Sequence, residues 1–210
     1  MVEHRRFRRP AMLDMEEAEQ IEGDIDPLDR ALVAHESAAA LVNQARASRD
    51  PELVERLVRL VEEEGIDTVA MMWSKAEPHT LPGALWRIYM LREWVRHSPD
   101  QVARSYHEGV SAAQVRHAIA GVEDPPGPEE VKRLADQILS GVFSGDLALA
   151  LFRAGAFCRV VATGAAFEAQ TDEGHADARA HKATLRAAQL LRTGEELERC
   201  ASLWKDGELE

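Results

Sequence analysis

Ser98-Pro99-Asp100-Gln101 is the stretch that decides the fold class, because it carries the signals of a helix N-terminus. The Ser98 hydroxyl can cap a helix, Pro99 suits the first helical position, and Gln101 can bond back to the capping residue. Three other places repeat this pattern in whole or in part: Asp50-Pro51, Ser111 with Gln114, and Thr193 with Glu196. Nothing comparable marks strands or hairpins, so the sequence predicts an all-α fold.

Apolar residues at helical spacing predict a globular bundle of about nine helices around two central apolar ones, at 81–97 and 146–167. The first helix starts after Asp26-Pro27. Its expected buried stripe consists of Leu28, Ala31, Leu32, Ala39 and Val42. Further helices are expected to begin near residues 51, 66, 99, 112, 131, 177 and 194. Gly155 and Gly164 indicate close helix contacts in the second central helix.

The chain is organised as a charged tail and one multihelical domain. Residues 1–25 combine a basic cluster with an acidic block and few large apolar residues, which predicts disorder. Residues 26–206 form the domain, with halves 26–122 and 128–206. The Pro-rich loop between the halves is too short to separate independent domains.

Composition narrows the class of partner and the compartment. The net charge of −12 disfavours non-specific binding to duplex nucleic acid. The only candidates for such binding are the tail arginines Arg5, Arg6, Arg8 and Arg9. Two cysteines make no disulfide framework, which favours the cytoplasm. The apolar stretch 147–167 contains two arginines, each costing about 2.5–3.5 kcal/mol at a bilayer centre, so we expect a core helix and no membrane span.

Reaction and cofactor motifs are missing from the sequence. It holds no Walker loop, no Gly-x-Gly-x-x-Gly, no Gly-x-Ser-x-Gly and no His-Glu-x-x-His. His35 and His181 lie on apolar helical stripes, where they could act as metal ligands or an acid–base pair, or be satisfied core residues or the edge of a stripe. Asp177 and His181 are i,i+4 neighbours, but the Glu-x-x-His pairs of a di-iron bundle are lacking. We therefore predict no metal and no cofactor.

Two arginines and three aromatic residues are the remaining candidates for a ligand site. Arg153 and Arg159 interrupt an apolar helix, where each could meet an anionic ligand, pair with an internal carboxylate or extend to the surface. Trp86, Tyr89 and Trp94 could line an aromatic pocket, although aromatics at helical spacing are usually core residues.

Two stretches resemble a known family. They are Leu-Pro-Gly-Ala-Leu-Trp-Arg at 81–87, which runs on to Tyr-His-Glu-Gly at 106–109, and Phe-Cys-Arg-Val-Val-Ala-Thr-Gly at 157–164. Together they resemble an uncharacterised all-helical family of actinobacterial proteins. The resemblance implies a bacterial cytoplasmic setting and no particular activity.

Two functions from different classes fit these observations. The first is a cytoplasmic protein–protein interaction or self-associating module, favoured by the helix-only architecture and the missing reaction motifs. The alternative is a small-molecule or metal-dependent enzyme, or a ligand sensor, with its site between the two halves. That site would require convergence in one cavity of at least three residues from the set Arg153, Arg159, Trp86, His35 and His181, with Tyr89 as a further candidate for ligand binding.

Overall fold

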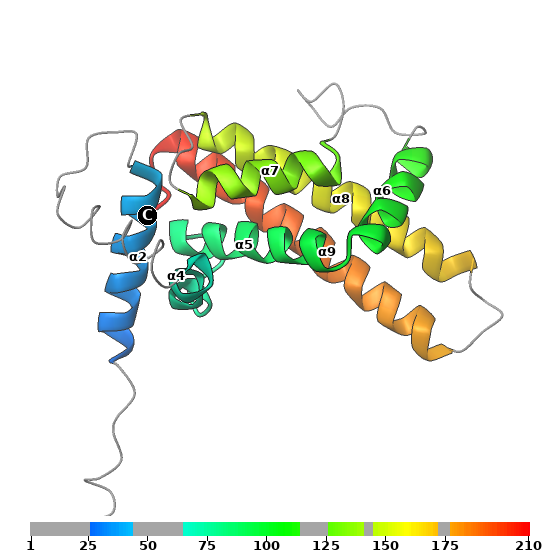
Figure 1. Cartoon of the computed structure of the whole chain (residues 1–210), viewed down its shortest axis with the longest axis horizontal. Helices are drawn as coiled ribbons and strands as arrows, with labels where there is room; N and C mark the ends of the chain where they lie inside the picture. The colour runs from blue at the N-terminus through cyan, green and yellow to red at the C-terminus, as the bar shows by residue number, and fades with distance from the viewer. Residues whose placement is uncertain (1–25, 44–64, 114–125, 141–144, 172–176) are drawn as a thin grey trace, which may run out of the picture.

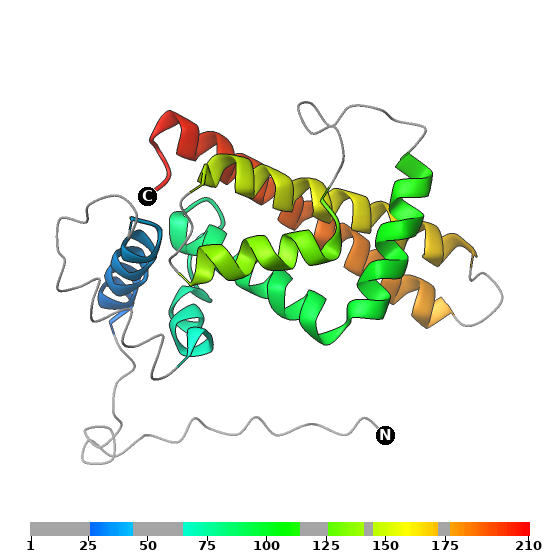
Figure 2. The same ribbon diagram turned by 45° about the horizontal axis from the view of Figure 1, so that its top comes forward.

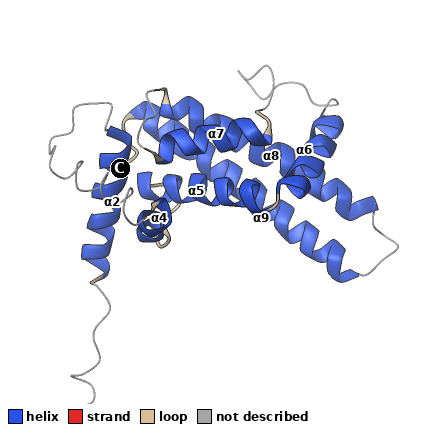
Figure 3. Ribbon diagram, in the orientation of Figure 1, coloured by secondary structure: helices blue, strands red, loops and turns tan. Residues whose placement is uncertain are grey.

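All regular secondary structure in the described residues is helical, which confirms the all-α prediction. The computed structural model describes residues 26–43, 65–113, 126–140, 145–171 and 177–210. Figure 3 shows helices joined by loops throughout these ranges. The helices are α2 (Pro27–Asn43), α4 (Ile66–Trp73), α5 (Leu81–His97), α6 (Pro99–Ala113), α7 (Pro128–Leu139), α8 (Leu147–Thr171) and α9 (Asp177–Asp206).

The described ranges hold seven helices, so the prediction of about nine was wrong in number. The predicted break before residue 194 does not exist, because α9 runs unbroken through it. There the Thr193 hydroxyl donates back to the Gln189 carbonyl at 3.0 Å instead of capping a new helix. Ser111 likewise lies inside α6 rather than before a new helix. The helix expected near residue 51 and residues 114–121 of the next one lie outside the described ranges.

Proline and capping side chains set three helix starts, and the starts at Pro27 and Pro99 were predicted from the sequence. Helix α2 begins at Pro27, where the Leu28 amide donates to the Asp26 carboxylate at 2.9 Å. Helix α6 begins at Pro99. At the start of α5 the Thr80 hydroxyl accepts a hydrogen bond from the Gly83 amide at 3.2 Å. These local interactions fix the direction in which each helix leaves its loop.

Helices α5 and α8 are the central elements, as the sequence predicted. Helix α5 packs against α2, α4, α6, α7 and α9, while α8 packs along α9 and beneath α6 and α7. Figures 1 and 2 show α8 and α9 as a long antiparallel pair that α6 crosses steeply. Although the segment Leu147–Phe167 is long and apolar enough to cross a membrane, 72% of its most apolar part is buried inside the protein. This segment is therefore a core helix, as expected from the sequence.

Glycines allow the close crossings of α8 with its neighbours. A Cβ atom on Gly164 would lie 1.8 Å from the Ser105 carbonyl oxygen of α6, and one on Gly109 would lie 1.9 Å from the Val160 carbonyl oxygen of α8. Backbone therefore meets backbone where these two helices cross. Gly155 of α8 and Gly194 of α9 make a second, looser approach, with Cβ-to-carbonyl distances of 3.0 Å.

Helix α2 buries a different face from the one predicted. Leu28 is 78% exposed and Leu32 is 57% exposed, so the predicted stripe through them is wrong. The buried face runs through Ala34, Ser37, Ala38 and Leu41. It packs against α4 and α5, where the Ser37 hydroxyl accepts a hydrogen bond from the buried indole N–H of Trp73 at 3.0 Å. Three small residues on this face let α2 pack closely against its neighbours, and Leu41 is the large apolar residue that it buries.

Candidate functional site

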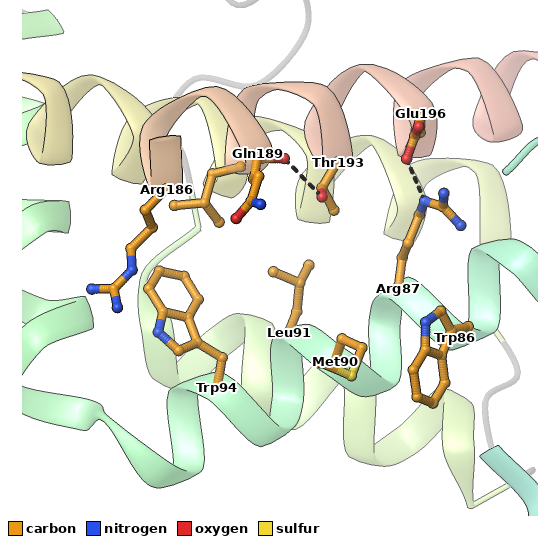
Figure 4. Close-up of a pocket in the computed structure, with 10 residues that line it drawn as sticks. Trp86, Arg87, Met90, Leu91, Trp94, Arg186, Gln189, Thr193 and Glu196 are labelled. Atoms are coloured by element: carbon orange, nitrogen blue, oxygen red, sulfur yellow. Dashed lines mark hydrogen bonds and ion pairs between the residues drawn. The ribbon is translucent and has the colours of Figure 1, made fainter. Parts of the chain in front are cut away.

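A groove of about 430 Å³ lies between α5 and α9. Figure 4 shows its two walls, one from each helix, with Leu91 and Trp94 of α5 reaching toward α9 and the indole of Trp86 directed away from it. Helix α5 contributes mainly large apolar and aromatic side chains, and α9 contributes mainly polar ones. The residues used below are Trp86, Arg87, Met90 and Trp94 of α5, and Arg186, Gln189, Thr193 and Glu196 of α9.

The apolar wall follows from residue spacing on α5. Trp86, Met90 and Trp94 are four residues apart, so they lie along one face of the helix. Met90 is 47% exposed, and both tryptophans are partly exposed. The opposite face of the same helix is fully buried, with Leu85 and Ile88 in the core. Helix α5 thus presents a row of large apolar side chains to solvent while its other side holds the fold together.

An ion pair closes one end of the groove. The Arg87 Nε donates to the Glu196 carboxylate at 2.6 Å, and Arg192 reaches the same carboxylate at 3.1 Å. Burial opposes ionisation of Glu196, but hydrogen bonds and charges from Arg87 and Arg192 outweigh it, so the pKa of Glu196 is lowered. Arg87 also donates to the Gly83 carbonyl at 2.8 Å. This cluster fixes α9 against the first turns of α5.

Arg186 stands at the other end of the groove. Its side chain extends past the indole of Trp94, as Figure 4 shows. Within the described ranges Arg186 forms neither an ion pair nor a side-chain hydrogen bond, although it is only partly exposed. Between the two ends, Gln189 and Thr193 form the polar wall. The groove is therefore apolar along one side and carries an available guanidinium at one end.

The two arginines that the sequence singled out lie elsewhere and each meets a carboxylate. Arg159 forms a bidentate pair with Glu198 of α9, with both N–O distances at 2.5 Å. Its hydrogen bonds to Glu198 raise the pKa of Arg159. Arg153 pairs with Glu130 of α7. Both arginines therefore pair with a carboxylate of the same chain, which is one of the three alternatives that the sequence left open.

The remaining sequence candidates do not come together. His181 is exposed on α9, so it is not a core residue and does not face an interior site with His35. His35 is half-buried in a separate cavity of about 420 Å³ between α2 and the segment joining α4 to α5. Tyr89 stacks on Trp86 with ring centroids 5.5 Å apart, but it is not among the residues that line the groove. Among Arg153, Arg159, Trp86, Tyr89, His35 and His181, Trp86 alone is a lining residue of the groove.

Tyr89 is held outside the groove by a hydrogen bond. Its hydroxyl donates to the Asp67 carboxylate of α4 at 3.0 Å. Burial and this hydrogen bond raise the pKa of Tyr89 to about 12. A phenol held in its neutral form by an acceptor is poorly suited to act as a base near neutral pH. Tyr89 therefore fastens α4 to α5.

The cysteine thiols are equally unsuited to nucleophilic chemistry. Burial raises the pKa of Cys158 to about 12 and that of Cys200 to about 11. A thiol is nucleophilic mainly as the thiolate, which these environments disfavour. Within the described ranges, no three His, Cys, Asp or Glu side chains lie together as a set of metal ligands.

No family model, no curated protein and no solved structure matches this chain. The functional interpretation therefore rests on the geometry of the groove.

The groove includes two of the three aromatic residues that were candidates for a pocket, Trp86 and Trp94, and not Tyr89. The aromatic residues of α5 were singled out, but Met90 between them and Arg186, Gln189 and Thr193 of α9 were not. The spacing of Trp86, Met90 and Trp94 by four residues could have revealed the row on α5. Nothing in the sequence indicates that α9, about a hundred residues further on, forms the facing wall.

Proposed function

We propose that this chain is a cytoplasmic helical interaction module that binds the apolar face of a partner helix in the groove between α5 and α9. The observation that carries the proposal is the partly exposed row of Trp86, Met90 and Trp94 on one face of α5. Tryptophan and methionine are enriched in protein interfaces, and aromatic anchors supply much of their binding energy. An amphipathic helix in a groove is a common mode of recognition that uses such rows.

The dimensions of the row suit a helical occupant. Trp86 and Trp94 are eight residues apart on a helix, which corresponds to about 12 Å along its axis. A partner helix would cover that length with about two turns, using apolar residues at positions i, i+3 or i+4, and i+7. The polar wall formed by Gln189 and Thr193 would lie along the side of such a helix.

The alternative, an enzyme or a ligand sensor, has less support from the same contacts. Arg153 and Arg159 are engaged by carboxylates, and His35 lies in a different cavity from Trp86. The volume of the groove would accommodate a small molecule. However, its lining offers neither an activated nucleophile nor a group suited to act as a base.

Selection of helical peptides tests the proposal without knowledge of the natural partner. A displayed library of amphipathic helices with varied polar positions would be selected on the full chain. Binders would then be measured by fluorescence anisotropy against Met90→Asp, with Leu149→Asp as the matched control. Leu149 of α8 is 49% exposed, close to the 47% of Met90, but it lies outside the groove.

The proposal expects enriched helical binders that lose at least tenfold in affinity on Met90→Asp and keep it on Leu149→Asp. Circular dichroism would establish that both variants remain folded. If no peptide is enriched, or if both variants weaken binding equally, the groove is not a helix-binding site.

A further inference from the structure

The charges around the groove define the chemistry of its occupant, on the assumption that the proposed helix-binding function is correct. Arg87 and Arg192 share one carboxylate, that of Glu196. Arg186 adds a third guanidinium, which has no charged partner in the described ranges. The groove and its rim therefore carry an excess of positive charge in a chain whose net charge is −12.

Covering Arg186 with an apolar surface would be unfavourable. A partner helix seated on Trp94 would remove water from the neighbouring guanidinium. Loss of hydration costs free energy unless a carboxylate or another acceptor replaces the water, and a guanidinium can bind a carboxylate through two hydrogen bonds. An occupant with an acidic side chain at this end would meet that requirement.

We propose that the partner is an acidic amphipathic helix that places an aspartate or glutamate against Arg186. Its apolar residues lie on Trp86, Met90 and Trp94, and the acidic residue follows about one turn beyond the apolar residue that contacts Trp94. The opposite end of the groove needs no such charge, because Arg87 is already paired with Glu196 and the side chain of Arg192 is 77% exposed, so its guanidinium keeps its water. The charge pattern thus also sets the direction of the bound helix.

Charge exchange between peptide and protein tests this inference. A selected binder would be synthesised with glutamate, glutamine or lysine at the position next to Arg186. Each peptide would be titrated by anisotropy against the wild-type chain, Arg186→Glu and the control Arg199→Glu. Arg199 is exposed on the same helix and outside the groove, so its substitution changes the net charge by the same amount.

The glutamate peptide should bind the wild-type chain about tenfold more tightly than the lysine peptide at low salt. Arg186→Glu should reverse that preference, and Arg199→Glu should leave it in place. If selected peptides show no preference for an acidic residue and Arg186→Glu leaves their affinities unchanged, the charge inference is wrong. In that case, loss of binding on Met90→Asp would still support the helix-binding function. Binding that depends on Arg186 but survives Met90→Asp would overturn both, since the occupant would then be an anion outside the apolar row.

Discussion

Replacement of Gly109 by alanine should destabilise the fold through a steric clash at one helix crossing. The added Cβ would lie 1.9 Å from the Val160 carbonyl oxygen, whereas ordinary contact begins near 3.4 Å. The obstacle is backbone of α8, so no side-chain rotation can relieve it. Helix α6 would have to move outward by roughly 1.5 Å, the difference between those two distances.

The expected magnitude is the balance of two effects. Alanine in a helix interior is favoured over glycine by about 1 kcal/mol. Overpacking of a well-packed interface costs about 1–3 kcal/mol, and the rigid backbone obstacle at Val160 places this case at the upper end. The net loss should be about 2 kcal/mol. For a chain of this size, it corresponds to a fall in melting temperature of about 4–8 °C.

Thermal and urea unfolding followed by circular dichroism would measure this loss. Ser111→Ala, at an exposed position on the same helix, is the control and should change the melting temperature little. Gly164→Ala should resemble Gly109→Ala, because its Cβ would meet the Ser105 carbonyl. The double variant should lose less than the sum of the two, since one displacement of α6 makes room for both methyl groups. A Gly109→Ala protein as stable as the wild type would refute the close crossing.

Three further predictions concern α9 and the buried thiols. Because the pKa of Glu196 is lowered in the folded state, Glu196 contributes stability above its unfolded pKa and loses that contribution as the pH falls. Between about pH 6 and pH 3 the free energy of unfolding should therefore fall more in the wild type than in Glu196→Gln. The control Glu195→Gln should show the same fall as the wild type. An equal fall in the wild type and Glu196→Gln would contradict the ion cluster. Thr193→Ala should change stability by less than about 0.5 kcal/mol in urea unfolding, since the hydroxyl bonds back within α9, whereas a loss of about 1 kcal/mol would indicate a helix cap. Cys158 and Cys200 should react with iodoacetamide far more slowly in the native protein than after unfolding, as counted by mass spectrometry, and equal rates would show that they are accessible.

The sequence predicted those parts of the fold that depend on local chemistry. Prolines marked the starts of α2 and α6 because proline fits the first helical position, whereas α7 begins at Pro128, three residues before the expected start. The buried face of α7 was also predicted, since Val131, Ala135 and Ile138 repeat at helical spacing and are almost fully buried. The two central helices were identified by their apolar length.

Features that depend on distant packing were not predictable from one sequence. Thr193 and Gly194 together look like a helix start, but Gly194 serves a close approach to Gly155, and α9 continues through it. Leu28 and Leu32 look like core residues, yet small residues on another face of α2 fit the neighbouring helices. In both cases a tertiary contact overrides a local signal.

In the candidate site, too, features set by local sequence were predictable and features set by distant contacts were not. Arg159 was identified as a charge in an apolar helix, but its partner Glu198 lies on another helix, so pairing and ligand binding could not be separated in advance. The apolar residues of the groove could be found by spacing on α5. Its second wall and the position of Arg186 became evident only when α9 was seen beside α5.

The indole N–H signals of the four tryptophans give the most direct test of helix binding in the groove. Trp86 and Trp94 line the groove, Trp73 is buried beside α2, and Trp204 lies near the end of α9. A selected acidic helical peptide would be titrated into ¹⁵N-labelled protein, with each signal assigned by a Trp→Phe variant. The Trp86 and Trp94 signals should shift while those of Trp73 and Trp204 stay in place. Shifts confined to Trp73 or Trp204, or bound peptide with no shift at Trp86 and Trp94, would contradict the assignment of the groove as the binding site.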